Sequence, residues 1–181
     1  IEPSRGLGDV YKRQEKQLDE LVKKLNEKSF IAVDTETSSL NPQEADLVGV
    51  SLCYEANQAF YIPVGHTEKT ELKKDVVLSK LKPILEDPSI KKVGQNIKYD
   101  FIIFKNHGIE LSSIEDTMLL SYTLDAGNNR HNMDTLSELH LGHKTISYKE
   151  LVGTGKKQLN FSEVDLKSVS YTHLRAHETA Q

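Results

Sequence analysis

The chain alternates between segments with a helical hydrophobic period and short apolar runs that suit strands. Near the N-terminus, apolar residues recur at the i, i+3, i+4 and i+7 positions of an amphipathic helix, namely Leu18, Leu21, Val22 and Leu25. Residues 30–35 begin with the apolar run FIAV and predict a buried strand. Residues 46–54 and 59–64 are further strand candidates, and the polar EANQ segment between them suits a hairpin loop.

The pattern then predicts helices around one more strand. A helix is expected over residues 74–86, where Pro83 should bend it or start a separate turn. A short strand at residues 91–94 leads into a helix of about residues 96–106, and Gly108 stands where a helix C-terminal glycine belongs. This order predicts a mixed α/β sheet: the hairpins make the first three strands antiparallel, and the helical crossover makes the fourth parallel.

Two further helices carry capping signals. Asp116 should cap a helix over about residues 117–124. Asp134 should cap one over about residues 135–141, which Gly142 should end.

The remaining segments are poorly patterned. Residues 143–160 are predicted to be mostly loop, and a last helix is expected to begin near Ser162. Residues 1–14 and 171–181 show no period, and we expect both ends to be non-native to a domain that covers residues 15–170. The alternative is that both are frayed native termini.

Composition narrows the class of protein. A chain of 181 residues with 37% hydrophobic residues can form one domain with a real core. The net charge of −4 argues against a broad basic face for duplex DNA but allows local nucleic-acid contacts. The single Cys53 excludes an internal disulfide framework. No apolar run approaches the roughly 18 residues of a membrane span, and no signal peptide is evident, so we expect a cytoplasmic protein without membrane contact.

Two carboxylates at the end of the first predicted strand suggest chemistry. Asp34 and Glu36 are spaced i, i+2, so their side chains point to the same face of the sheet. Like charges this close repel each other, and a divalent cation with its preference for hard oxygen ligands would remove the penalty. The alternative is that both are solvated at a strand end.

A third carboxylate falls on the inward stripe of a predicted helix. Asp100 is three residues from Ile97 and four from Phe104, and a carboxylate on a buried stripe needs a partner or a metal. A salt bridge to Lys98 or Lys105 is the alternative.

The motifs together resemble a known family. The segments DTET, GQNIKYD and RHNMDTLSELHLGHKTISYKELVGTGKKQLNF resemble the proofreading 3′–5′ exonuclease domain of bacterial DNA polymerase I. The resemblance runs from about residue 15 to Ser170. It implies a ribonuclease H-like fold with a mixed, five-stranded sheet flanked by helices, and a site of four acidic ligands plus a tyrosine.

The resemblance also assigns roles. Asp34, Glu36 and Asp100 match metal ligands for two Mg²⁺ or Mn²⁺ ions, and Tyr171 matches the motif tyrosine that orients the attacking water. The positions matching groups that bind the substrate strand are Leu40, Gln95, Asn96, Tyr99, Arg130 and Tyr148. Three of these have plain alternatives: Asn96 as an N-cap, Tyr99 as a core aromatic and Arg130 as a solvated loop residue.

One departure from the family is expected to matter. The position of the fourth acidic ligand holds Arg175, so the site is C-terminally truncated and this chain is expected to be weakly active or inactive. The implied substrate is a single-stranded DNA 3′ end, with a covalently linked polymerase domain in a monomeric parent protein. The alternatives are a non-catalytic, structural exonuclease-like domain and an RNA-trimming 3′–5′ exonuclease.

Overall fold

The computed structural model describes most of the chain between residues 15 and 169. The described residues are 15–56, 58–68, 72–142, 144–145, 148–155, 158–166 and 169. Both ends predicted to be non-native, residues 1–14 and 171–181, lie outside them.

A mixed five-stranded sheet forms the centre of the domain, with strand order β3-β2-β1-β4-β5. The strands are β1 (Phe30–Thr37), β2 (Leu47–Cys53), β3 (Ala59–Pro63), β4 (Lys91–Gly94) and β5 (Ile114–Asp116). β1–β2 and β2–β3 are antiparallel, whereas β1–β4 and β4–β5 are parallel. The predicted mixed α/β class and the strand directions are therefore confirmed. The five strands implied by the resemblance are confirmed, but the residue pattern did not locate the three-residue β5, because a strand this short carries no readable alternation.

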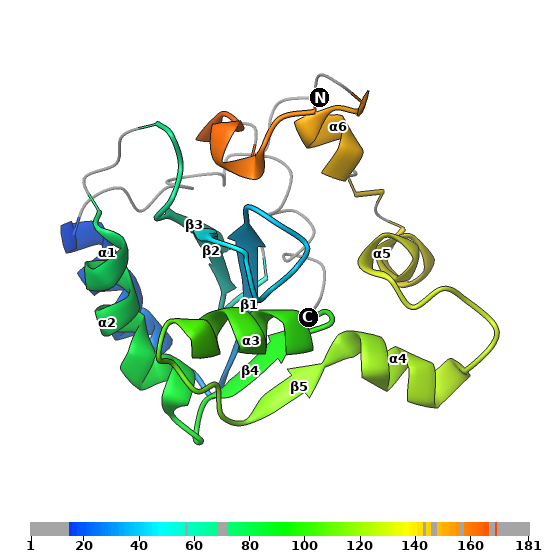
Figure 1. The fold of residues 1–181 in the computed structure, drawn as a ribbon. Helices are drawn as coiled ribbons and strands as arrows, with labels where there is room; N and C mark the ends of the chain where they lie inside the picture. Colours follow the sequence, from blue (N-terminus) through cyan, green and yellow to red (C-terminus); the bar gives the residue numbers. More distant parts are fainter. Residues whose placement is uncertain are drawn as a thin grey trace, which may run out of the picture.

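Helices flank the sheet and connect its strands (Figure 1). They are α1 (Glu15–Leu25), α2 (Lys74–Glu86), α3 (Lys98–Asn106), α4 (Thr117–Asp125), α5 (Met133–Leu141), α6 (Tyr148–Val152) and the 3₁₀ turn η2 (Phe161–Glu163). α1 and α2 lie side by side, whereas α4 and α5 lie beyond the opposite end of the sheet. None of the helices in the described part of the chain has the length and apolar character needed to cross a lipid bilayer.

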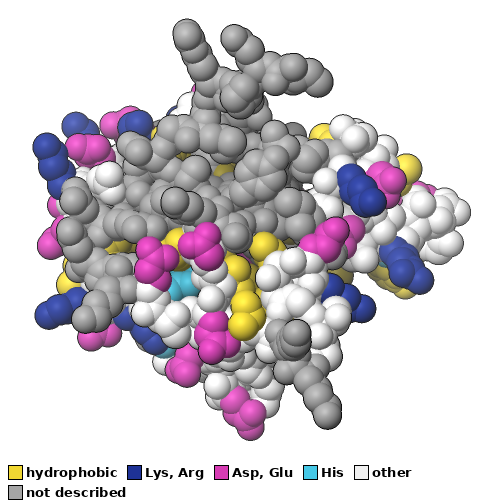
Figure 2. Space-filling view, turned by 90° about the horizontal axis from the view of Figure 1, so that it is seen from above, with side chains coloured by type: hydrophobic (Ala, Val, Ile, Leu, Met, Phe, Trp, Pro, Cys, Tyr) yellow, Lys and Arg dark blue, Asp and Glu magenta, His cyan; other side chains and the backbone are white. Residues whose placement is uncertain are grey.

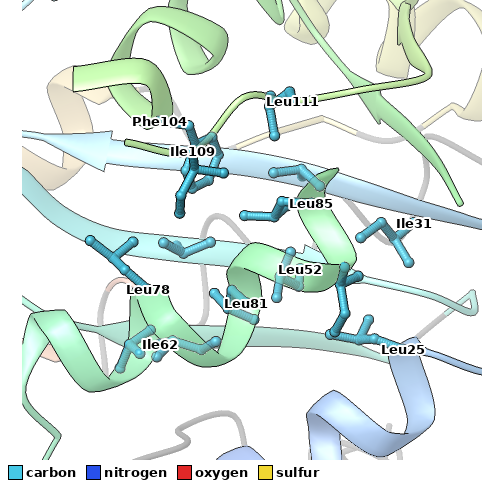
Figure 3. Packing of buried hydrophobic residues seen from close by; sticks show 14 of the residues in the cluster. Leu25, Ile31, Leu52, Ile62, Leu78, Leu81, Leu85, Phe104, Ile109 and Leu111 are labelled. Atoms are coloured by element: carbon cyan, nitrogen blue, oxygen red, sulfur yellow. The ribbon is translucent and has the colours of Figure 1, made fainter. Parts of the chain in front are cut away.

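The two faces of the sheet bury different things. Ile31 and Val33 point into the larger core, which the apolar faces of α1, α2 and α3 complete. Figure 3 shows Leu78, Leu81 and Leu85 of α2 directed at the sheet in this core. Because strand side chains alternate, the even-numbered residues of β1, including Asp34, point to the opposite face of the sheet. That face carries a smaller cluster, in which β2 and β3 contribute Val48 and Tyr61, and the C-terminal part contributes Val152, Phe161, Val164, Leu166 and Val169.

Several boundaries differ from the predictions for local reasons. Pro83 lies within a continuous α2 and is exposed near its C-terminal end, where water can hydrate the carbonyl that proline leaves unpaired. α5 begins two residues early, because the Asn132 side chain caps it by accepting from the Thr135 N–H, in place of the predicted Asp134.

The C-terminal half also departs from its predicted pattern. The predicted loop over residues 143–160 contains the short α6. The helix expected near Ser162 begins as the 3₁₀ turn η2, capped by Asn160 and Glu163. In contrast, the Asp116 cap of α4 is confirmed, as are the terminal glycines Gly108 and Gly142, both with positive φ.

A buried ammonium ties the end of α2 to β4 and β5. The side chain of Lys92 is fully buried, and its Nζ donates to the carbonyls of Asp87 and Ile90, each at 2.6 Å. Longer contacts reach the Ile84 carbonyl at 3.5 Å and Ser112 Oγ at 3.4 Å. Burial lowers the pKa of the Lys92 ammonium below its ordinary value. The carbonyls compensate for the lost hydration and fix the turn that precedes β4.

We expect Lys92→Met to lower the free energy of unfolding by about 1–3 kcal/mol, because buried carbonyls lose a charged donor. Urea unfolding followed by circular dichroism would measure this loss. Lys91→Met is the matched control: the neighbouring side chain is exposed and paired with Glu115 at the surface, so its loss should stay below about 1 kcal/mol. Equal losses in the two variants would contradict the structural role given to Lys92.

Candidate active site

The two strand carboxylates lie on the face of the sheet that turns away from α1 and α2. Asp34 is half-buried and Glu36 is buried. Their cross-strand neighbours on β2 are Ser51 and Gly49, respectively. The i, i+2 spacing within a strand directs both acids to the same face of the sheet.

Asp100 reaches β1 from the first turn of α3. Its Oδ1 accepts the Thr35 N–H at 2.8 Å and the Thr35 hydroxyl at 2.6 Å, and the residue is 3% exposed. β4 pairs with β1 only as far as Val93 opposite Ala32, so β1 has no strand partner on that side at Thr35. The Asp100 carboxylate takes the place of the missing strand. The alternative salt bridge to a lysine of α3 is therefore not what holds it.

The strand and helix carboxylates interact electrostatically. Burial, and next the charge of Asp34, raise the pKa of Asp100 well above its ordinary value, against the effect of the Thr35 hydrogen bonds. Glu36 belongs to the same group of charges: burial is the main cause that raises the pKa of Tyr99, and the charges of Asp100, Glu36 and Asp34 raise it further. The protein has thus placed like charges close together in a poorly hydrated position.

These carboxylates fit a hard divalent cation by their chemistry. All three supply oxygen donors, and their repulsion is the cost that a cation would relieve. In the described part of the chain, no three His, Cys, Asp or Glu side chains are already arranged to hold a metal ion.

Tyr99 connects α3 to the end of β1. Its hydroxyl lies 2.5 Å from Thr37 Oγ1 and donates to the Ser39 carbonyl at 2.5 Å. The ring is partly buried against the larger core. Tyr99 is thus partly a core aromatic, and its polar end anchors the loop that carries Leu40, whose side chain is 91% exposed.

An aromatic pair stands beside the carboxylates. The ring of Tyr148 stacks on Phe161 with centroids 6.2 Å apart, and Tyr148 is 46% exposed. Burial raises the pKa of Tyr148, and the charge of Glu36 raises it further, which places the tyrosine near that acid. Tyr148 therefore joins the group, whereas Arg130 is simply exposed and Tyr171 lies outside the described residues.

The polar groups of the GQN loop, between β4 and α3, contact neighbouring segments of the chain. The Gln95 side chain donates to the His131 carbonyl at 2.7 Å and accepts from Thr117 Oγ1 at 2.6 Å. Its amide therefore holds the segment before α5. Asn96 does not cap α3, because the N-cap residue is Ile97 and has no side-chain cap. Asn96 is exposed.

Some residues of the site region were missed in the sequence. Thr35 orients Asp100 across 65 residues, and no local sequence signal indicated this contact. Tyr61 and His66 form a hydrogen bond of 2.6 Å, and the Tyr61 hydroxyl lies only 2.0 Å from where a Cβ on Gly49 would be. The absence of a side chain at Gly49, directly opposite Glu36, therefore makes room for a buried tyrosine.

The surroundings are apolar on one side and weakly charged overall. An apolar cavity of about 400 Å³ adjoins β1 and β4 beneath α4 and α5, with Ala32, Val93, Leu120 and Leu136 in its lining. In Figure 2, Lys and Arg side chains lie towards the edges of the visible face, and its described part shows no continuous basic surface.

Comparison with known sequences identifies the family. Residues 10–166 match the family model described as 3′-5′ exonuclease. The chain is 43% identical over 155 residues to DNA polymerase I of Pseudomonas aeruginosa, which covers 82% of the chain and 17% of that protein. It is 39% identical over 181 residues to DNA polymerase I of Rhizobium leguminosarum, covering 89% of the chain and 18% of that protein. The chain thus spans less than a fifth of the length of these relatives.

Solved structures confirm the ribonuclease H-like fold. Trypanosoma brucei RNase D superposes with a TM-score of 0.72 at 17% identity, over 93% of this chain and 61% of that one. Escherichia coli RNase D gives 0.67 at 20% identity, over 96% of this chain and 41% of that one. At these identities the likeness concerns the fold. Together with the sequence relatives, it shows that the chain belongs to the 3′–5′ exonuclease family and corresponds to the exonuclease domain of DNA polymerase I.

Proposed function

We propose that this domain trims single-stranded DNA from its 3′ end, one nucleotide at a time, in the presence of Mg²⁺ or Mn²⁺, as the proofreading part of a monomeric polymerase. The observation that carries the proposal is the buried Asp100 held against β1 next to Asp34. The repulsion between these two acids lowers the stability of the domain, and cation binding would account for their placement.

The carboxylates are assigned as the cation ligands. Thr35 occupies Oδ1 of Asp100, and we assign Oδ2, with Asp34 and Glu36, to cation binding. Two bound divalent ions would supply an activated water and stabilise the leaving 3′ oxygen. The rigid hold of Thr35 on Asp100 limits how far this ligand can move, so Glu36 is the acid that would adjust.

The surrounding residues are assigned to the substrate strand. Tyr148, backed by Phe161, offers a ring face on which a terminal base can stack. Leu40 projects from the anchored loop and can separate the last bases. Tyr99 and Asn96 lie on the α3 side of the carboxylates. Arg130, exposed before α5, would contact phosphate.

The first test is cation-dependent trimming. With Mn²⁺ and a 5′-labelled single-stranded DNA oligonucleotide, we expect weak 3′ trimming that is lost in Asp34→Ala and without Mn²⁺. Glu27→Ala removes an exposed acid remote from the site and serves as the control. Equal trimming by the unsubstituted chain and Asp34→Ala would refute a catalytic role. Faster trimming of an RNA oligonucleotide of the same sequence would favour the RNA-trimming alternative.

A second test restores the fourth acid. Replacing residues 172–181 by a helical segment with aspartate at position 175 should strengthen Mn²⁺ binding and raise trimming. The gain should reach at least the roughly 10–100-fold that even outer-shell groups contribute at metal sites. Isothermal titration calorimetry would measure the affinity. A helical segment with asparagine at position 175 is the matched control, and an equal gain from it would show that the acid is not the missing group.

Asp100→Asn should separate stability from cation binding. The amide oxygen can still accept both Thr35 hydrogen bonds, while the buried charge and its repulsion from Asp34 disappear. We therefore expect an equal or higher melting temperature in EDTA at neutral pH. Addition of Mn²⁺ should raise the melting temperature of the unsubstituted chain by mass action but leave that of the variant unchanged.

The same variant should change how stability depends on pH. The folded-state pKa of Asp100 is raised, so its stabilising contribution is present below the unfolded pKa of about 3.9 and is lost as the pH rises through the raised value. In EDTA, the melting temperature of the unsubstituted chain should lose this contribution over that window, and Asp100→Asn should not. Parallel pH profiles for the two proteins would contradict the burial of a titrating Asp100.

A further inference from the structure

The Asp116 carboxylate accepts backbone hydrogen bonds from two separate segments. Oδ1 accepts the N–H groups of Met118 at 2.9 Å and Leu119 at 3.4 Å, which caps α4. Oδ1 also accepts the Asn96 N–H at 3.0 Å, and Oδ2 accepts the Ile97 N–H at 3.1 Å. Capping α4 would need only the first pair. The second pair fixes the loop between β4 and α3, about twenty residues earlier in the chain.

The backbone of that loop has an uncommon conformation at Asn96. Its φ is 57°, in the left-handed region that non-glycine residues rarely adopt, although asparagine tolerates it better than most. Such a conformation persists only where the surroundings determine it. Here they do: the parallel register sets Gly94 opposite Asp116, so the carboxylate lies beside the turn and receives two consecutive N–H groups from it.

The other members of the loop are held from the same direction. Thr117, directly after Asp116, donates its hydroxyl to the Gly94 carbonyl at 3.2 Å and to Gln95 Oε1 at 2.6 Å. Hydrogen bonds from Asp116 and Thr117, at the start of α4, therefore hold the loop from Gly94 to Ile97. The side chain of Asn96 takes no part in these bonds. That side chain belongs to an exposed residue, four positions before the buried Asp100.

We propose that Asp116 is a positioning residue for the 3′-end subsite: it fixes the left-handed turn that presents the Asn96 amide to the terminal nucleotide beside the carboxylates. This inference rests on the proposed function. A side-chain amide offers both a donor and an acceptor, so it can bind a phosphate oxygen and a sugar hydroxyl. Without Asp116, the N–H groups of Asn96 and Ile97 lose their acceptors, and the turn no longer fixes the direction of the Asn96 amide.

The test is a double-mutant cycle on DNA affinity. The dissociation constant of a 5′-fluorescein-labelled single-stranded DNA oligonucleotide is measured by fluorescence anisotropy with Ca²⁺ in place of Mn²⁺. Asn96→Gly keeps the left-handed turn accessible but removes the amide. Asp116→Ala removes the carboxylate, and Asp116→Asn, which keeps one acceptor oxygen, is the milder variant should the alanine variant unfold. Asp75→Ala, which removes an exposed carboxylate from the first turn of α2, is the control.

We expect the effects of the Asn96 and Asp116 substitutions on DNA affinity to be non-additive. Asn96→Gly and Asp116→Ala should each weaken DNA binding about 3- to 10-fold, the value of about one hydrogen bond. The double variant should bind no more weakly than Asn96→Gly alone, because Asp116 acts through the amide. Asp116→Asn should fall between the unsubstituted chain and Asp116→Ala, and Asp75→Ala should leave affinity unchanged.

Two results would overturn the inference. If Asp116→Ala or Asp116→Asn weakens binding equally with and without the Asn96 amide, Asp116 serves stability alone. Unchanged affinity in Asn96→Gly would show that the amide has no ligand. Failure of the unsubstituted chain to bind the oligonucleotide would instead refute the proposed function itself, and the positioning role with it.

Discussion

The pairing of the Asp100 carboxylate with Thr35 is the interaction on which the site depends. It compensates for the early end of β4 by giving the β1 backbone an acceptor where no strand continues. It also buries a negative charge close to Asp34. The same contact therefore supplies the missing hydrogen-bond acceptor beside β1 and brings two carboxylates close enough to repel each other. A divalent cation would relieve this repulsion. Asp100 lies on α3, which follows β4, and the parallel pairing of β4 with β1 brings this helix to β1. The antiparallel pairing with β2 holds the other side of β1, the strand that carries Asp34 and Glu36.

The two faces of the sheet divide stability from chemistry. On one face, Ile31 and Val33 meet the leucines of α1 and α2 in the larger core, and the carbonyl-bound Lys92 secures the turn into β4. The opposite face has to hold charges, and its packing is correspondingly smaller, with Tyr61, Phe161 and Val152 as its main members. Because the stable face already positions β1, the acids on the other face can be tolerated although they repel each other.

The sequence predicts the framework well and the supporting contacts poorly. The alternation in FIAVDTET, the hairpin loop and the glycines after α3 and α5 each depend on nearby residues, so strand directions and most helix bounds can be worked out from them. The acids were found in the same way, since the i, i+2 spacing fixes a shared face. Thr35 holding Asp100 spans 65 residues, and no local pattern reports a contact of that range. The hydrogen bond from the Gln95 amide to the His131 carbonyl joins residues 36 apart and is likewise not readable from a local pattern.

The structural similarity to RNase D concerns the fold of the domain, whereas the sequence similarity to DNA polymerase I identifies its family. The structures at 17–20% identity share the overall fold, with TM-scores of 0.72 and 0.67, and a fold by itself does not select DNA or RNA. Selection has to lie in groups that touch the strand, and the groups that we propose for this role stand on loops and short elements: Leu40 after β1, Asn96 before α3, and Tyr148 at the start of α6. Their positions depend on contacts such as Tyr99 to Ser39 and Asp116 to Asn96, which cross between elements. Substrate choice can therefore change while the carboxylates and the core stay in place, because the two sets of residues are held by different interactions.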